Sequence, residues 1–297
     1  MEEVASRMYR HGWYQIAFEH ELAEGLTPIH LAERRLMALK RNGSIRVFDA
    51  TCPHRGANLA YGGKVCDDHV VCPFHGERVH LGTAAAGFFA RDYASLVIGG
   101  GVFVGMSDSM KPDFPAGLQD LQRRFELIPG FAIEIEAPVE VVADNAFDSG
   151  HFKAVHAILN EPEFTFGGGG FGELRAEGEF IIPTANPTQP ARVKYSTGAF
   201  SPGIMISEMT GDPPYNYIVM STATAGEQPN RCTIRVTLGL KPPIDHNFRD
   251  LFMEASRQGL EQDRAVWRHV ARDHAPAWRP RDAAAVAFRE FCKRFVA

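Results

Sequence analysis

The chain has 297 residues, of which 45% are hydrophobic and 23% are charged, a composition typical of a globular protein with its own buried core. A net charge of −5 and the lack of any Lys/Arg-rich run argue against a nucleic-acid partner. The N-terminus lacks the pattern of a signal peptide. The longest apolar stretch, residues 94–106, is broken by glycines and falls short of the roughly 20 residues that span a bilayer. We therefore predict a cytoplasmic protein that does not cross a membrane.

The first hundred residues have the pattern of short strands. Strand-like segments occupy residues 36–40, 44–48, 68–72 and 102–105. The first two flank Asn42-Gly43, a pair that favours a tight hairpin turn. These features predict a small antiparallel β domain over residues 1–112, with a Pro-containing linker at residues 111–115.

The pattern changes after the linker. Strand-like segments occupy residues 132–135, 217–224 and 232–240, and helix-like segments occupy residues 139–156 and 247–274. The last segment is the clearest helix, because apolar residues such as Leu251, Ala255 and Val266 recur near helical spacing. We predict an α+β domain over residues 113–297, with an antiparallel sheet and a long C-terminal helix.

Two short Cys-His motifs lie in the N-terminal domain. Cys52-Pro53-His54 is followed, after a gap of 17 residues, by Cys72-Pro73-Phe74-His75. In a Rieske [2Fe–2S] cluster two cysteines bind one iron and two histidines bind the other. Zinc accepts the same four ligands, but zinc fingers group their cysteines ahead of their histidines, whereas each loop here supplies one of each. The spacing therefore favours the iron–sulfur cluster.

A second group of metal-binding side chains lies at residues 144–156, which include Asp144, Asp148, His151 and His156. Two histidines and one carboxylate form the facial triad of non-haem iron oxygenases, which leaves coordination positions open for oxygen and substrate. The two histidines are five residues apart, whereas ligands on one helix face are usually four apart. We therefore expect an irregularity in this helix.

Spacing alone leaves the carboxylate of the triad open. Asp148 is one candidate, and the C-terminal helix offers Glu254, Glu261, Asp263 and Asp273. Asp263 has Gly259 and Val266 about one turn away, but its spacing does not separate it from Glu261.

With these motifs the chain resembles the α subunit of the Rieske non-haem iron oxygenases over nearly its whole length, and within them the ketosteroid-hydroxylase-like branch. The resemblance lies in Arg55-Gly56-Ala57, in the Pro-Phe-His-Gly run of the second loop, and in Asp144-Asn145-x-x-Asp148-x-x-His151-x4-His156. It implies a Rieske domain followed by a helix-grip-like catalytic domain. It also implies two cofactors, a [2Fe–2S] cluster and a mononuclear Fe(II).

The resemblance implies a role for individual residues. The cluster ligands are Cys52, His54, Cys72 and His75, the iron ligands are His151, His156 and Asp263, and the catalytic signature includes Asn145 and Asp148. Asp148 corresponds to the bridging aspartate, which links an iron-ligand histidine to a cluster histidine of a neighbouring subunit, here His75. These roles imply a head-to-tail homotrimer in which electrons cross the subunit interface through His75, Asp148 and His151.

Two positions distinguish the chain from the respiratory Rieske proteins. Those proteins carry a disulfide between the two loops, at the positions held here by Ala57 and Phe74, so the chain resembles the oxygenase and ferredoxin class. Cys66 matches no ligand position, and we expect it to be a buried free thiol. Five cysteines without a signal peptide argue against a disulfide framework.

Residues 167–172 fit the pattern G-x-G-x-x-G, but a strand-like segment follows them instead of a helix. This favours a flexible loop that lies over the pocket, rather than a nucleotide site. The chain then needs electrons from a separate reductase, with or without a ferredoxin.

We therefore expect a terminal oxygenase that uses O₂ to hydroxylate, or oxidatively demethylate, a bulky hydrophobic small molecule. Phenylalanines near the triad, such as Phe147 and Phe152, are consistent with an apolar pocket. Arene dihydroxylation, desaturation and oxidative cyclisation are alternatives within the same family. An alternative from another class is a Rieske electron-transfer protein without oxygenase activity.

Overall fold

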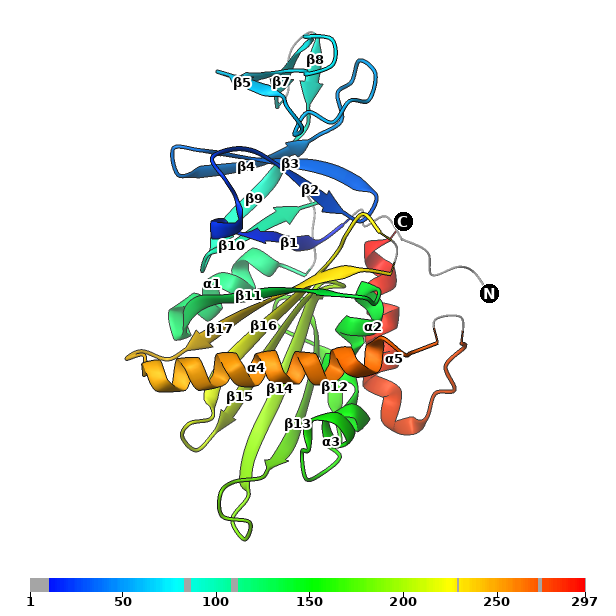
Figure 1. The fold of residues 1–297 in the computed structure, drawn as a ribbon. Coiled ribbons are helices and arrows are strands. Elements are labelled where there is room, and N and C mark those ends of the chain that lie inside the picture. Colours follow the sequence, from blue (N-terminus) through cyan, green and yellow to red (C-terminus); the bar gives the residue numbers. More distant parts are fainter. Residues whose placement is uncertain (1–10, 83–86, 108–111, 229, 272–273, 297) are drawn as a thin grey trace.

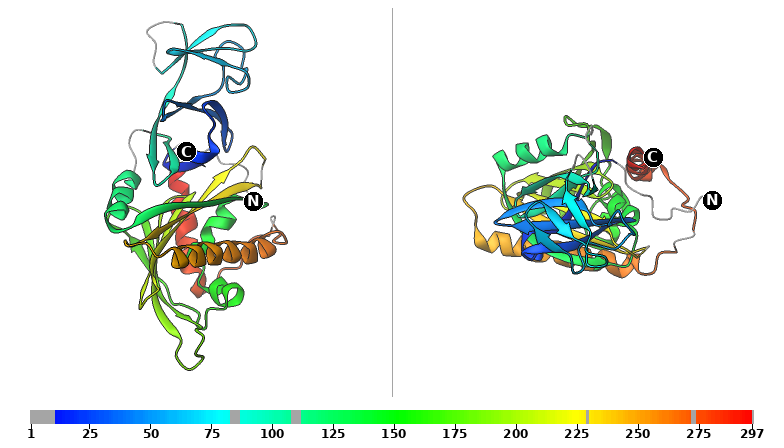
Figure 2. Two further views of the ribbon diagram at one scale, coloured as in Figure 1. Left: turned by 60° about the vertical axis from the view of Figure 1, so that its left-hand side comes forward. Right: turned by 90° about the horizontal axis from the view of Figure 1, so that it is seen from above.

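The structure is a computed structural model that describes residues 11–82, 87–107, 112–228, 230–271 and 274–296. Three sheets follow one another along the long axis of the molecule (Figures 1 and 2). A small four-stranded sheet lies at one end and a six-stranded sheet in the middle. A seven-stranded sheet with its helices forms the larger remaining part.

The six-stranded sheet is antiparallel and has the order β1-β10-β9-β4-β3-β2. Its elements are β1 (Trp13–Phe18), the 3-10 turn η1 (Glu19–Glu21), β2 (Gly25–Leu31), β3 (Arg34–Arg41), β4 (Ser44–Asp49), β9 (Asp92–Ile98) and β10 (Gly101–Gly105). The hairpin predicted at Asn42-Gly43 is confirmed. It joins β3 to β4, and both turn residues have the positive φ that this tight turn requires.

The four-stranded sheet has the order β5-β6-β7-β8. Its strands are β5 (Lys64–Cys66), β6 (His69–Val71), β7 (Arg78–Leu81) and β8 (Phe88–Ala90). Val65, Val70 and Val79 lie on one face and pack into a core shared with Met37 and Phe48 of the larger sheet. The predicted N-terminal β domain is therefore confirmed, except that β7 and β8 pair in parallel.

The seven-stranded sheet is antiparallel and has the order β11-β17-β16-β15-β14-β13-β12. The helix α1 (Phe114–Arg124) precedes it, and its strands are β11 (Glu126–Ile135), β12 (Thr165–Gly168), β13 (Leu174–Ile182), β14 (Ala191–Ser201), β15 (Ile204–Gly211), β16 (Asn216–Ala225) and β17 (Cys232–Leu240). The predicted α+β class and antiparallel sheet are confirmed.

A long helix, α4 (His246–Trp267), crosses one face of this sheet (Figure 1). It begins after Asp245, whose side chain accepts hydrogen bonds from two backbone amides of the first turn. Phe252 anchors it against Leu238 and Leu240 of β17. The predicted extension to residue 274 is wrong. The helix ends at Trp267 because the next apolar residue at helical spacing, Val270, is exposed and gives no buried face to extend.

The segment predicted as one helix over residues 139–156 is broken into three elements. They are α2 (Val139–Ala143), the 3-10 turn η2 (Asp144–Phe147) and α3 (Ser149–His156). Asp148, between the last two, has extended backbone and caps α3 through its side chain. The expected irregularity therefore lies ahead of both histidines and not between them.

The helix α5 (Ala283–Cys292), between the 3-10 turns η3 (Pro280–Asp282) and η4 (Lys293–Phe295), supports this broken segment. Phe147 of η2 stacks on Phe288 of α5 with ring centroids 4.9 Å apart, and both side chains are fully buried. Such pairs add stability beyond the apolar area they bury.

Strand β1 packs the N-terminal part against the seven-stranded sheet. The Thr222 hydroxyl donates to Gln15 Oε1 at 2.9 Å, and Arg235 Nε donates to Glu21 Oε2 at 2.7 Å. The domain boundary between residues 112 and 113 falls between β10 and α1 and stays a prediction. Within the described ranges, none of the helices has the length and apolarity needed to span a membrane.

Candidate functional site

The two Cys-His motifs form a pair of matching loops, one after β4 and one after β6. Each loop closes with the same two backbone hydrogen bonds: Cys52 N to Ala57 O (2.8 Å) and Gly56 N to Cys52 O (2.9 Å), then Cys72 N to Glu77 O (2.8 Å) and Gly76 N to Cys72 O (3.0 Å). Gly56 and Gly76 both have positive φ, near 78° and 75°, which glycine adopts without strain. The sequence therefore folds both motifs into one shape.

The loops bring together the four predicted cluster ligands. Cys52 and Cys72 are buried, and burial, followed by the hydrogen bond with the Cys72 thiol, raises the pKa of the Cys52 thiol. His54 and His75 are exposed, with their ring centroids 4.7 Å apart. Two thiols and two imidazoles, one of each from either loop, fit the donor set of a Rieske cluster.

The prediction that Cys66 is buried is wrong. Cys66 is exposed, because it ends β5 at the tip of the β5–β6 hairpin, where Asp67 and Asp68 turn the chain. Phe74, at one of the positions that hold a disulfide in the respiratory proteins, is also exposed.

The second predicted site forms where α3 meets α4. One ligand atom from each of His151, His156 and Asp263 can be chosen so that all three lie within 4.8 Å of one another. Within the part of the chain that the structure describes, this is the one such group of His, Cys, Asp and Glu side chains. Two imidazoles and a carboxylate at this separation fit a mononuclear iron.

Both histidines have one ring nitrogen already engaged. His151 Nδ1 lies 2.7 Å from the backbone carbonyl of Asp148, and His156 Nδ1 lies 3.0 Å from Gln262 Oε1. These oxygens accept, so both contacts are satisfied by a proton on Nδ1, and a neutral ring in that tautomer presents the lone pair of Nε2 to a metal. His156 Nε2 lies 3.3 Å from Asp263 Oδ1.

The two histidines differ in their electrostatics. Burial, the largest effect, lowers the pKa of His151. Burial also acts to lower the pKa of His156, but the hydrogen bond and charge of Asp263 outweigh it, so this pKa is raised. Asp263 itself is buried. The triad therefore pairs a buried carboxylate with the neighbouring imidazole, whose cationic form it stabilises.

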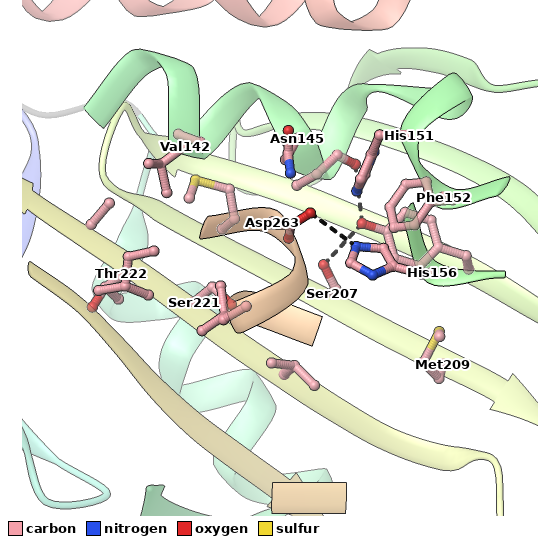
Figure 3. Close-up of a pocket in the computed structure, with 18 of the residues that line it drawn as sticks. Val142, Asn145, His151, Phe152, His156, Ser207, Met209, Ser221, Thr222 and Asp263 are labelled. Atoms are coloured by element: carbon pink, nitrogen blue, oxygen red, sulfur yellow. Dashed lines mark hydrogen bonds and ion pairs between the residues drawn. The ribbon is translucent and has the colours of Figure 1, made fainter. Parts of the chain in front are cut away.

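A cavity of about 200 Å³ opens on one side of the triad (Figure 3). Its apolar walls come from α2, α3, α4 and the sheet and include Val142, Phe152, Phe180, Met205, Met209, Val219, Ile234, Leu260 and Trp267. Its polar groups other than the triad are Asn145, Tyr195, Ser207, Tyr217, Ser221 and Thr222. No Lys, Arg or Glu is among the described residues that line it.

Hydroxyl groups tie this cavity to the metal-binding segment. The Tyr195 hydroxyl donates to the backbone carbonyl of Ala146 at 3.0 Å and lies 3.1 Å from Ser207 Oγ. Tyr195 on β14 thus fixes η2 to the sheet, and Ser207 on β15 faces the cavity. Sequence reasoning missed Tyr195, Ser207 and Gln262. The adjacency of Gln262 to Asp263 was the one available signal.

Asn145 lines this cavity and also a second, outer cavity of about 370 Å³. Asp148 lines the outer cavity, together with Val266 and Trp278, and is not among the residues that line the first. The cluster loops lie beside the β5–β8 sheet, at the far end of the molecule from α3 (Figure 1). Within one chain, Asp148 therefore lies far from the cluster loops.

The other carboxylates considered for the triad lie elsewhere. Glu254 and Glu261 are exposed and pair with Gln258 and Arg264 on the surface of α4. Asp273 lies outside the described residues.

The glycine-rich segment at residues 167–172 does not cover the cavity, contrary to expectation. Asp113 N donates to the Phe171 carbonyl at 2.8 Å, and Phe171 N donates to the buried Glu173 carboxylate at 2.9 Å. These bonds hold the segment beside the start of α1, and a strand, β13, follows it as predicted.

Two family matches cover most of the chain. Residues 12–87 match the Rieske [2Fe-2S] domain, and residues 110–296 match the 3-ketosteroid 9alpha-hydroxylase C-terminal domain. Cholesterol 7-desaturases of Xenopus laevis and Drosophila melanogaster are 30% and 27% identical over 165 and 164 residues. These matches cover 50% of this chain but only 36% and 38% of the relatives, so the matched region spans little more than a third of their length.

Solved structures share the fold. NdmB of Pseudomonas putida CBB5 has a TM-score of 0.73 at 18% identity, covering 96% of this chain and 90% of that one. Dicamba monooxygenase bound to 3,6-dichlorosalicylic acid also has a TM-score of 0.73 at 18% identity, covering 97% and 98%.

A two-loop Cys-His site in an N-terminal β domain, followed by a two-histidine, one-carboxylate site on a helix-covered sheet, defines a class of two-site iron oxygenases. The chain belongs to the Rieske non-haem iron oxygenases, with a C-terminal domain of the 3-ketosteroid 9alpha-hydroxylase family. These proteins are oxidoreductases. The Rieske domain binds a [2Fe–2S] cluster, and the catalytic domain of the family uses a mononuclear iron.

Proposed function

We propose that the chain is a terminal oxygenase that uses O₂ to hydroxylate, or oxidatively demethylate, a neutral hydrophobic small molecule. The observation that carries this proposal is the position of the His151, His156 and Asp263 triad at the wall of a largely apolar cavity. A protein that only transferred electrons would need no such cavity beside a second metal site.

Each site residue has a role in this proposal. Cys52, His54, Cys72 and His75 hold the cluster in residues 1–112, and His151, His156 and Asp263 hold the iron in residues 113–297. The bound iron supplies the reductive activation of O₂. The protein supplies the rest: Asn145 stands at the cavity wall, and the apolar lining excludes water from the reacting carbon.

The charge of the cavity supports a neutral substrate. An anionic substrate would leave its carboxylate buried without a cationic partner, because no Lys or Arg is among the described lining residues. The Ser221 hydroxyl can donate to a carbonyl oxygen, whereas Ser207 Oγ, which donates to Thr197 Oγ1 at 3.0 Å, can accept from a substrate hydroxyl. A neutral, steroid-like scaffold that carries one or two carbonyl or hydroxyl oxygens would match this apolar, uncharged lining.

The surfaces around the two sites support a head-to-tail homotrimer. Tyr61 and Phe74, 60% and 62% exposed, lie on the cluster-bearing part, and Val266 and Trp278, 49% and 45% exposed, lie beside Asp148. Exposed apolar side chains at both ends suit a contact in which the cluster loops of one subunit meet Asp148 of the next.

Electrons would come from a separate reductase, with or without a ferredoxin. A ferredoxin complex is known for carbazole 1,9a-dioxygenase, which has a TM-score of 0.69 at 16% identity with this chain. His54, the cluster histidine that the proposed contact with Asp148 does not use, is exposed and gives a donor a point of approach.

Desaturation of the same class of substrate is the second candidate. The similarity to proteins named cholesterol 7-desaturase favours it, although the match covers little more than a third of their length. Product analysis separates the candidates, because a hydroxylase adds oxygen to the substrate and a desaturase removes hydrogen.

The proposal is tested by incubating the purified protein with a Rieske-type reductase, NADH, O₂ and a panel of neutral steroid ketones and their carboxylate analogues. We expect an oxidised product from a neutral compound and none from its carboxylate analogue. His151→Ala should abolish the product while the EPR signal of the reduced cluster persists. Turnover by His151→Ala at the wild-type rate would support an electron-transfer function instead.

A further inference from the structure

The side chain of Gln262 contacts a predicted iron ligand. Its Oε1 lies 3.0 Å from His156 Nδ1, and Gln262 immediately precedes Asp263 on α4. We infer that Gln262 is a positioning residue that fixes the tautomer and ring orientation of His156 so that Nε2 faces the iron. The inference rests on the proposed role of His156 and Asp263 as ligands.

Residues on one face of α4 contact both nitrogens of the His156 ring. Gly259, Gln262 and Asp263 are spaced three and four residues apart and so share that face. A Cβ added at Gly259 would lie 3.8 Å from His156 Cε1, so the ring lies against the helix at this point. Gln262 then meets Nδ1, and Asp263 meets Nε2 at 3.3 Å.

The choice of tautomer decides whether the site is open. If the neutral ring carried its proton on Nε2, this N–H would donate to Asp263, and the two ligand atoms would bind each other instead of a metal. An acceptor at Nδ1 draws the proton to that side and leaves the Nε2 lone pair free. The Gln262 amide oxygen is such an acceptor.

The two histidines differ in the acceptor that contacts Nδ1, and only the acceptor of His156 can be removed by a side-chain substitution. His151 Nδ1 bonds to the backbone carbonyl of Asp148, which no side-chain substitution removes. The corresponding acceptor for His156 comes from a side chain. Because Gln262 is exposed, water competes for Nδ1, and we expect an effect near the lower end of the 10–100-fold range for such partners.

The test measures Co(II) binding by calorimetry to protein that keeps its [2Fe–2S] cluster but has been stripped of mononuclear iron with a chelator. Gln262→Leu and Gln262→Met, which lack the acceptor, should each raise the Kd about tenfold. Gln262→Glu keeps an acceptor and should bind at least as tightly as wild type. The matched control is Gln258→Leu, one turn earlier on α4. The Gln258 side chain donates to the exposed Glu254 at 2.9 Å, so its loss should leave the Kd unchanged.

The inference is overturned if Gln262→Leu binds Co(II) within twofold of wild type, or if Gln262→Glu is weakened as much as Gln262→Leu. The absorption spectrum of the cluster and the thermal unfolding of each variant check that the protein is folded. His156→Ala separates this inference from the proposed function. If His156→Ala binds Co(II) as tightly as wild type, the triad is not the metal site and the proposed function itself fails.

Discussion

At the scale of single residues, the two metal sites differ in how far the sequence defines them. Each Cys-His motif is local, and four of the ligands follow from two short spacings. The triad joins residues that are more than a hundred positions apart, so spacing alone does not identify its carboxylate and does not separate Asp263 from Glu261. In the structure Asp263 is buried beside His156, while Glu261 points to the surface and pairs with Arg264.

Substituting these two acids gives a matched pair of variants. Asp263→Asn should lose the mononuclear iron and retain the cluster, because a neutral amide is a poor substitute for the ligand carboxylate. Glu261→Gln should retain both, because its side chain is exposed. Iron and sulfide quantification on each purified variant checks this, and an iron-replete Asp263→Asn would refute the assignment.

Ser207 is predicted to bind the polar oxygen of the substrate. Ser207→Ala should raise KM about fivefold, with little change in kcat, because one neutral hydrogen bond contributes about 1 kcal/mol. Steady-state kinetics on a neutral steroid alcohol measures this, because Ser207 donates its own proton to Thr197 and can accept one from a substrate hydroxyl. The control is Ser196→Ala on β14, which removes a hydroxyl bonded to Arg175 outside the cavity and should leave KM unchanged. Equal KM values for both variants would contradict this role for Ser207.

At the scale of elements, the segment over residues 139–156 shows where sequence reasoning failed. Its composition is compatible with one helix, yet the structure breaks it at η2 and again at Asp148. The break depends on tertiary contacts. The Tyr195 hydroxyl donates a hydrogen bond to the Ala146 carbonyl, and Phe288 stacks on Phe147. These partners lie far along the chain, so no local pattern could reveal them.

An ion pair between η2 and α5 is also part of this support. Arg289 donates two hydrogen bonds to Asp144, at 2.9 and 2.5 Å, and its guanidinium lies over the Trp278 ring. Burial, only partly offset by Arg289, raises the pKa of Asp144 to about 6. An acid with a raised folded-state pKa binds protons more readily when folded, so its contribution to stability declines as pH rises.

This predicts a pH dependence that Asp144→Asn should lack. Between about pH 4 and pH 6 the free energy of unfolding of wild type should fall relative to Asp144→Asn, by up to about 3 kcal/mol for a shift of this size. Denaturant unfolding of both proteins across this range measures the difference, and other titrating groups cancel in the comparison. A constant difference across the range would contradict the raised pKa.

At the scale of the whole molecule, the sequence predicted the two-part architecture and the class of each part, because both motifs and the strand patterns are local. The packing of β1 on the large sheet through Gln15 and Thr222 and the course of α4 across that sheet required the structure. The position of the two metal sites in separate parts of the molecule also required the structure.

That separation predicts complementation between subunits. His75→Ala, which lacks an intact cluster, and His151→Ala, which lacks the iron site, should each be inactive. Co-expressed, they should recover about a quarter of wild-type activity, the fraction of interfaces in a random assembly that pair an intact cluster with an intact iron site. Turnover of the purified mixed assembly measures this. Recovery no greater than the sum of the two single variants would contradict transfer between subunits.

The most direct test of the proposed oxygenase function is a single turnover of chemically reduced protein with ¹⁸O₂ and a neutral steroid ketone, followed by mass spectrometry of the product. Wild type should give a product that carries ¹⁸O at a former C–H position, and His151→Ala should give none. An oxidised product without ¹⁸O would indicate desaturation, and the absence of any product across the panel of neutral substrates would contradict the proposed oxygenase function.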